Sequence, residues 1–178
     1  MKVDFDITKI KMIISDFDGI FTDGTGYINS DGLISKRIHF HDVMGIAVAL
    51  KFGLKVVIIT GEASGAVEYL NKKFEELEVF QDVKYKIQLV KELAEKYHLT
   101  PDEILYIGDD VNDADSLLFA GVKVTVPNAN ILIKQINNIK ITDKKGGEGV
   151  LREVVDALTS SLTQEKIMLG ELCKWADF

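Results

Sequence analysis

Asp16 and Asp18 stand two residues apart in the string Asp-Phe-Asp-Gly, directly after the apolar run at residues 12–15. Two carboxylates at the end of a strand can share one reaction, because one attacks as a nucleophile while the other serves as general acid and base. Carboxylate oxygens are also preferred ligands of Mg²⁺. The alternative is a solvated turn after a strand, since a string this short is weak evidence by itself.

A second group of acids follows the apolar run at residues 104–107, where Asp113 comes soon after Asp109 and Asp110. Carboxylates crowded at one edge of a sheet repel one another, and a divalent cation relieves that repulsion. The alternative is that Asp110 or Asn112 caps the next helix, which accounts for one acid of the three at most. This group therefore indicates a metal site shared with the first pair.

Thr60 and Gly61 end a third apolar run, at residues 56–59, and Lys86 opens an amphipathic segment. A hydroxyl and backbone N–H groups near the start of a helix suit a phosphate group. A lysine at a helix start opposes the helix dipole and therefore needs an anionic partner. The alternatives are a helix cap at Thr60 and an ordinary surface lysine at position 86, with Lys84 as a nearby competitor.

Short apolar runs alternate with helical patterns along the chain. Runs without polar alternation are typical of strands buried on both faces of a parallel sheet. Strands that alternate with helices predict an α/β fold with a doubly wound, Rossmann-like parallel sheet. The carboxyl ends of such strands meet at one crevice, so the polar groups should converge there. The predicted strands lie at residues 12–15, 56–59, 104–107 and 122–126, and the predicted helices at 43–51, 63–74, 86–97, 112–120 and 148–158.

Residues 26–41 break this rhythm, because two β-prone flanks enclose a turn. The pattern predicts a β-hairpin that serves as a flap over the crevice or as a contact between subunits. Alternation along its second strand places Arg37, His39 and His41 on one face. That face is either an anion-binding strip for a substrate or a solvated strand surface, whereas the apolar opposite face suits packing.

Composition narrows the class of protein. The chain has 178 residues, a net charge of −7, 47% hydrophobic and 28% charged residues, which is typical of one globular domain over residues 1–178. An acidic chain is a poor ligand for nucleic acids, and no stretch approaches the ~20 apolar residues of a membrane span. We find no secretory signal, and the single Cys173 excludes an internal disulfide, so we expect a reducing cytoplasm.

The chemical groups occur in a fixed order, as Asp16-x-Asp18-Gly with Thr22-Asp23-Gly, then Thr60-Gly, then Lys86, then Gly-Asp109-Asp110-x-x-Asp113. This set resembles the haloacid dehalogenase superfamily of phosphatases, over nearly the whole chain. No long insertion follows the first motif, so the chain resembles the branch without a cap domain. That branch holds the 3-deoxy-D-manno-octulosonate 8-phosphate (KDO 8-phosphate) phosphatases.

The resemblance implies a role for each acid. Asp16 would attack phosphorus and form an aspartyl phosphate, and Asp18 would act first as general acid and then as general base. Mg²⁺ would be held by Asp16, by the backbone carbonyl of Asp18 and by Asp109. Asp110 and Asp113 would support this site through hydrogen bonds or water.

The resemblance also implies a substrate and an assembly. Thr60 and Lys86 would bind the transferred phosphoryl group, and Gly61, Glu62 and Lys73 would complete the substrate site. The implied substrate is the phosphate ester of a 2-keto-3-deoxy sugar acid, foremost KDO 8-phosphate. Family members form tetramers in which the hairpins pack together, so the resemblance implies a homotetramer.

Two acids depart from the octulosonate pattern, which has arginine at the positions of Glu62 and Glu148. Both acids resemble a relative that acts on the 9-phosphate of the nine-carbon sugar acid KDN, although an arginine of that relative is replaced here by Leu70. A broad phosphatase and a non-catalytic assembly domain, as found on sugar-acid cytidylyltransferases, are further alternatives. Residues 160–178 are predicted to form a C-terminal tail with one more short helix.

Overall fold

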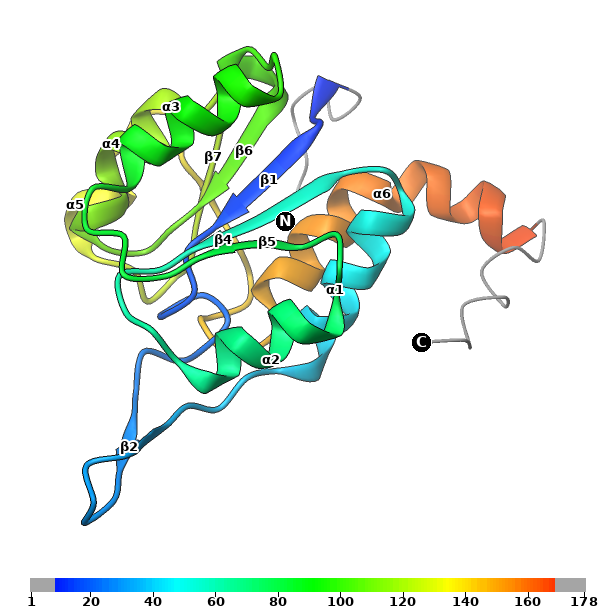
Figure 1. The fold of residues 1–178 in the computed structure, drawn as a ribbon. Helices are drawn as coiled ribbons and strands as arrows, with labels where there is room; N and C mark the ends of the chain where they lie inside the picture. The colour runs from blue at the N-terminus through cyan, green and yellow to red at the C-terminus, as the bar shows by residue number, and fades with distance from the viewer. Residues whose placement is uncertain (1–8, 169–178) are drawn as a thin grey trace.

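The structure, a computed structural model, describes residues 9–168. Its centre is a six-stranded parallel sheet in the order β5-β4-β1-β6-β7-β8 (Figure 1). β1 pairs with β4 on one side and with β6 on the other. Strands β4 and β5 are therefore added on one side of β1, and the later strands β6, β7 and β8 on its other side. Such a reversal in strand order opens a crevice at the carboxyl ends of the strands. The strands are β1 (Met12–Ser15), β4 (Lys55–Ile59), β5 (Glu78–Phe80), β6 (Ile104–Ile107), β7 (Val122–Thr125) and β8 (Lys140–Ile141).

Helices cover both faces of the sheet (Figure 1). Side chains alternate along a strand, so β1 contributes to two cores. Ile13 belongs to the core under α1, α2 and α6, whereas Met12 and Ile14 belong to the core under α3, α4 and α5. The first face holds α1 (Phe40–Lys51), α2 (Gly65–Lys73) and α6 (Val150–Met168), and the second holds α3 (Lys86–Lys96), α4 (Ala114–Phe119) and α5 (Ile131–Lys134).

The predicted α/β fold class is confirmed, and the differences lie at the periphery. The structure adds the edge strands β5 and β8 and the short helix α5. A 3₁₀ turn over Val111–Asp113 precedes α4, which is therefore shorter than predicted. α6 does not end near residue 158 but continues to Met168, because no glycine or proline interrupts it. Residues 160–168 thus extend α6 instead of forming a separate tail helix, and the rest of the predicted tail lies outside the described residues.

The predicted hairpin is formed by β2 (Tyr27–Ile28) and β3 (Ile34–Ser35), which pair antiparallel and project from the body of the molecule (Figure 1). We call residues 26–41 the flap. Within residues 9–168 the chain inserts no further domain that would serve as a cap. The same stretch contains no helix with the length and apolar character needed to cross a membrane.

Candidate active site

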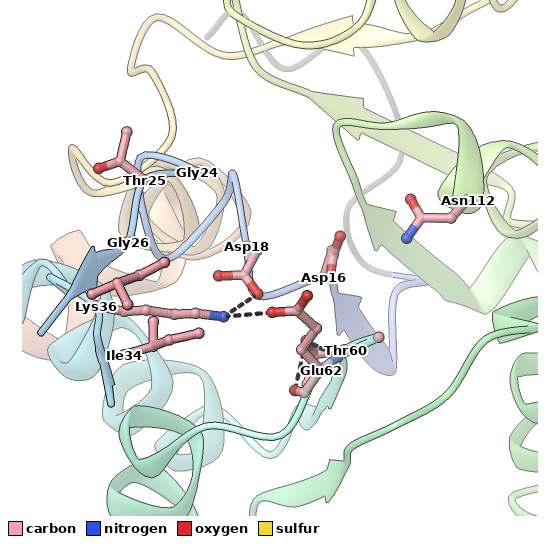
Figure 2. Close-up of a pocket in the computed structure, with 12 residues that line it drawn as sticks. Asp16, Asp18, Gly24, Thr25, Gly26, Ile34, Lys36, Thr60, Glu62 and Asn112 are labelled. Atoms are coloured by element: carbon pink, nitrogen blue, oxygen red, sulfur yellow. Dashed lines mark hydrogen bonds and ion pairs between the residues drawn. The ribbon is translucent and has the colours of Figure 1, made fainter. Parts of the chain in front are cut away.

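Three predicted site residues follow three adjacent strands. Asp16 follows β1, Thr60 follows β4, and Asp109 follows β6 after one glycine. A cavity of about 400 Å³ opens at this edge of the sheet (Figure 2). Its lining includes Asp16, Asp18, Thr60, Gly61 and Glu62 from the strand ends, and Ile28, Ile34 and Lys36 from the flap.

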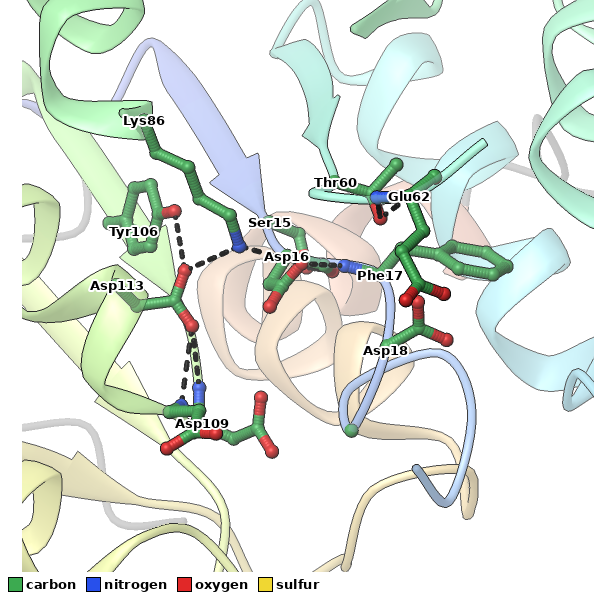
Figure 3. A network of polar contacts seen from close by, with 12 residues as sticks. Ser15, Asp16, Phe17, Asp18, Thr60, Glu62, Lys86, Tyr106, Asp109 and Asp113 are labelled. Carbon is green, nitrogen blue, oxygen red and sulfur yellow. Dashed lines mark hydrogen bonds and ion pairs between the residues drawn. The ribbon is translucent and has the colours of Figure 1, made fainter. Parts of the chain in front are cut away.

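Lys86 lies beneath this cavity, at the first residue of α3, and its side chain is fully buried. Its ammonium nitrogen Nζ lies 2.8 Å from Asp16 Oδ1 and 2.8 Å from Asp113 Oδ1 (Figure 3). The backbone N–H of Phe17 also donates to Asp16 Oδ1, at 2.6 Å. The surface-lysine alternative for position 86 is therefore wrong, because this lysine joins two buried carboxylates.

Each carboxylate oxygen of Asp113 accepts two hydrogen bonds. Oδ1 accepts from Lys86 and from the hydroxyl of Tyr106, at 2.8 Å each. Oδ2 accepts from the backbone N–H groups of Asp109 and Asp110, at 3.1 and 3.3 Å. A carboxylate has about four lone-pair positions, so Asp113 fixes the loop after β6 and has no position left for a further ligand.

Burial and neighbouring charges shift the pKa values of the acids and the lysine in this cluster. Burial raises the pKa of Asp16 well above its usual range, the neighbouring Asp113 charge adds to that rise, and Lys86 opposes it. Burial alone would lower the pKa of Lys86, but the charges of Asp113 and Asp16 outweigh it and hold that pKa above its usual range. Burial and the charges of Asp113 and Asp110 raise the pKa of Asp109 to about 7. The cluster therefore holds more negative charge than one lysine balances.

A divalent cation fits this excess of negative charge. Asp16, Asp109 and Asp113 each place a carboxylate oxygen within 4.8 Å of the other two. Since Asp113 is saturated, Asp16 and Asp109 are the two side chains of this group that can ligate a metal, and oxygen donors suit Mg²⁺. Gly19 allows the Asp109 carboxylate to approach the turn after β1, because the φ of Gly19 is +80° and a Cβ there would lie 2.0 Å from Asp109 Oδ2.

Asp18 is held by two side chains. The hydroxyl of the buried Thr22 donates to Asp18 Oδ1 at 3.2 Å, and the same hydroxyl accepts from the backbone N–H of Gly19. Lys36 donates to Asp18 Oδ2 at 2.7 Å. The turn after β1 therefore places the Asp18 carboxyl toward the cavity and in contact with the flap (Figure 2).

Thr60 is buried at the carboxyl end of β4. Its hydroxyl donates to the carbonyl of Glu62 at 3.3 Å and accepts from the Glu62 N–H at 3.4 Å. The helix cap of α2 is Ser64, whose side chain accepts from the N–H of Val67. The capping alternative for Thr60 is therefore wrong, and its loop instead brings Gly61 and Glu62 to the wall of the cavity.

Comparison with known proteins agrees with this arrangement. A family model for haloacid dehalogenase-like hydrolases matches residues 58–154, which are more than half of the chain. The chain belongs to this family. The curated KDO 8-phosphate phosphatase KdsC of Salmonella typhi is 32% identical over 151 residues, which cover 84% of this chain and 79% of that protein.

Solved structures of relatives show the same fold as this haloacid dehalogenase-like hydrolase. KDO 8-phosphate phosphatase from Moraxella catarrhalis, in complex with magnesium ion, phosphate ion and KDO, matches with a TM-score of 0.85 and 28% identity over 93% of this chain and 95% of that chain. The Yersinia pestis KDO 8-phosphate phosphatase matches with a TM-score of 0.82 and 29% identity over 91% of this chain and 86% of that chain. The likeness therefore extends over nearly the whole length of these proteins.

Some predicted residues of the hydrolase lie elsewhere. Lys73 lies beside the groove between α1 and α2, with its ammonium 5.7 Å from the ring centroid of Phe74, and it does not line the cavity. Glu148, which departs from the octulosonate pattern, accepts from the N–H of Lys145 at 3.2 Å and does not line the cavity either. Asp110 caps the 3₁₀ turn before α4, as the capping alternative proposed for this one acid.

Arg37, His39 and His41 do not share the strand face that alternation along the flap predicted. Strand pairing ends at Ser35, and His39 caps α1 through its Nδ1, which accepts from the N–H of His41 at 3.1 Å. Arg37 contacts Asp23 at 3.2 Å instead of facing the cavity. His39 and His41 therefore belong to the start of α1, and Arg37 lies in the segment between β3 and that helix.

Sequence reasoning missed two residues of this hydrolase's site, Lys36 and Tyr106. Lys36 interrupts the apolar flap face that carries Ile34 and Ile38, and this single charge on that face was the available signal. Tyr106 sits inside the apolar run of β6, where a buried hydroxyl needs a partner. No pattern in the sequence identified Asp113 as that partner.

Proposed function

We propose that this hydrolase is a Mg²⁺-dependent phosphatase of sugar-acid phosphate monoesters, with KDO 8-phosphate as its leading substrate. The observation that carries the proposal is the contact of Asp16 with Lys86 at the edge of a cavity that Asp18 and Thr60 also line. Phosphoryl transfer needs charge neutralisation and in-line positioning, and these groups supply both. The relatives named KDO 8-phosphate phosphatase support the choice of substrate.

In the proposed reaction, an oxygen of the Asp16 carboxylate bonds to phosphorus while the bond from phosphorus to the sugar oxygen breaks. Asp18 donates its proton to that sugar oxygen. Asp18 then takes a proton from a water molecule that attacks phosphorus, which frees Asp16 and inorganic phosphate. Thr60 donates a hydrogen bond to the phosphoryl group, and the charge of Lys86 stabilises the same group from beneath Asp16.

Asp16, Asp109 and the backbone carbonyl of Asp18 would hold the metal. When bound, Mg²⁺ supplies positive charge that stabilises the phosphoryl oxygens in the transition state. Asp113 keeps Asp109 and Lys86 in place through the four hydrogen bonds described above. The raised pKa values of Asp16 and Asp109 are consistent with a site built to receive a cation.

Rates of phosphate release from four esters test the substrate. We expect KDO 8-phosphate to exceed glucose 6-phosphate in kcat/KM by at least about 100-fold, because a matched polar site rejects ligands that leave its groups unpaired. KDN 9-phosphate tests the nine-carbon alternative, and p-nitrophenyl phosphate reports whether the nucleophile is active. Equal rates on glucose 6-phosphate would indicate a broad phosphatase, and inactivity on all four would support the assembly-domain alternative.

We also propose that the enzyme assembles as a homotetramer through the flap. Four large apolar side chains on this hairpin expose more than half of their surface, which is unusual for a lone ribbon. They are Tyr27, Ile28, Leu33 and Ile34. Light scattering should give four times the chain mass for the wild type and a smaller mass for Leu33→Ser. A monomeric wild type would overturn this proposal.

A further inference from the structure

Lys36 extends from the flap into the cavity and is the one cation among the described residues that line it. Its side chain is only 9% exposed, although it follows β3, whose two residues are exposed. Nζ lies 2.7 Å from Asp18 Oδ2 and 3.5 Å from Glu62 Oε2 (Figure 2). The flap therefore delivers a positive charge, already fixed in position, to the cavity wall.

The cavity has two chemically different ends. Asp16 and Thr60 line the end at the strands, where the phosphoryl group would sit in the proposed reaction. Ile34 and Lys36 line the end nearest the flap, where the leaving group would sit, and Glu62 reaches toward Lys36 from the loop after β4 (Figure 2). Since the Lys86 side chain is fully buried beneath Asp16, it cannot reach that second end.

The ammonium of Lys36 has capacity for a ligand. It carries three N–H donors, of which one donates to Asp18 at 2.7 Å, while Glu62 lies 3.5 Å away as an ion-pair partner. Because the side chain is held between two carboxylates, a ligand does not have to order it on binding. An anionic group on the leaving group would accept a hydrogen bond from a remaining N–H donor of Lys36. Glu62 beside it would accept hydrogen bonds from hydroxyl groups of the same leaving group.

We propose that Lys36 is a substrate-binding residue that selects a leaving group carrying a carboxylate. This inference rests on the proposed phosphatase function. It attributes the preference for a substrate with a carboxylate to one contact, the one with Lys36. It predicts that the acid group of a sugar-acid phosphate is recognised from the flap, beside Glu62.

A matched pair of substrates tests this contact, namely KDO 8-phosphate and the same compound with its carboxylate converted to a carboxamide. We expect Lys36→Met to lower kcat/KM for the acid by about 10- to 100-fold, the worth of a hydrogen bond to a charged group. The rate for the amide should fall much less, because it loses only the contribution of the contact between Lys36 and Asp18. Lys36→Arg should keep more of the preference for the acid, because the positive charge remains.

Controls separate this inference from the proposed function. Lys91→Met, an exposed lysine on α3, should leave both rates unchanged, and thermal unfolding checks that each variant folds. Equal losses on the acid and the amide, or no loss on either, in an active enzyme would overturn the assignment of Lys36. A wild type that hydrolyses neither compound would overturn the proposed function itself.

Discussion

The ammonium nitrogen of Lys86 lies 2.8 Å from Oδ1 of Asp16, although the two side chains are only 0% and 7% exposed. Removing two charges from water costs several kcal/mol per ion, and an apolar pair of similar volume is often as stable. A buried ion pair of this kind is therefore poorly explained by stability alone. Its place at the cavity edge agrees with a role in binding a phosphoryl group.

Replacing Lys86 by methionine leaves Asp16 and Asp113 buried without their cation. We expect Lys86→Met to lower the free energy of unfolding by about 3–5 kcal/mol at pH 8, measured by urea unfolding in EDTA. The loss should be smaller at pH 5, because burial raises the pKa of the Asp16 carboxyl in the folded state and this group takes up a proton as the pH falls. Lys91→Met is the matched control, and an equal loss at both pH values would contradict this account.

Tyr106 tests how much Asp113 depends on a single donor. Tyr106 is fully buried, and Tyr106→Phe keeps its shape but removes the hydroxyl that donates to Asp113 at 2.8 Å. We expect a loss of about 1–2 kcal/mol in the free energy of unfolding, with a moderate fall in kcat, because three donors to Asp113 remain. Tyr85→Phe, at a residue that is 83% exposed, should change neither quantity. Wild-type stability in Tyr106→Phe would argue against this hydrogen bond.

Mg²⁺ binding should depend on pH, because ligands must lose their protons before they bind a metal. The pKa of Asp109 is about 7 and that of Asp16 is also raised, so protons compete with Mg²⁺ as the pH falls. We expect the affinity to weaken by about tenfold per pH unit below this value for one released proton, in calorimetric titrations. Asp109→Asn should bind Mg²⁺ weakly at every pH. An affinity that is constant from pH 5.5 to 8 would exclude this linkage.

Asp42 gives a separate prediction about stability. This buried residue of α1 accepts from the N–H of Arg152 in α6 at 3.0 Å, and its Oδ2 has no hydrogen-bond partner in the described part of the protein. Burial raises the pKa of Asp42 to about 6, so the folded state binds a proton more tightly than the unfolded chain. Relative to Asp42→Asn, the wild type should lose about 2 kcal/mol of stability as the pH rises from 4 to 7.

Chemical unfolding of the two proteins across this pH range measures the difference. Asp115→Asn is a suitable control, because Asp115 is an exposed residue of α4. If the difference between wild type and Asp42→Asn stays constant from pH 4 to 7, the burial of this carboxylate does not govern its protonation.

The central strands could be predicted because their burial leaves a clear trace in the sequence. β1, β4 and β6 are covered on both faces, so their residues form apolar runs. Polar residues of the site follow each of these runs. The edge strands β5 and β8 have three and two residues and are only partly buried. Runs this short carry no periodicity from which a strand can be predicted.

The site residues that could be predicted are those that stand at the end of an apolar run. Asp16, Thr60 and Asp109 follow directly from the ends of strands, so spacing along the chain indicates their convergence. Lys36 depends on how the flap folds back over the cavity, 18 positions along the chain from its partner Asp18. Such a contact is set by tertiary packing, and the local pattern instead drew attention to Arg37.

The most direct test of the central claim is phosphate release from KDO 8-phosphate by the wild type and by Asp16→Asn, each with Mg²⁺ and with EDTA. We predict release by the wild type with Mg²⁺ and little with EDTA. Asp16→Asn should lose at least about 1,000-fold in kcat while staying folded, because an amide cannot serve as the nucleophile. Full activity of a folded Asp16→Asn, or equal wild-type rates with Mg²⁺ and EDTA, would contradict the account.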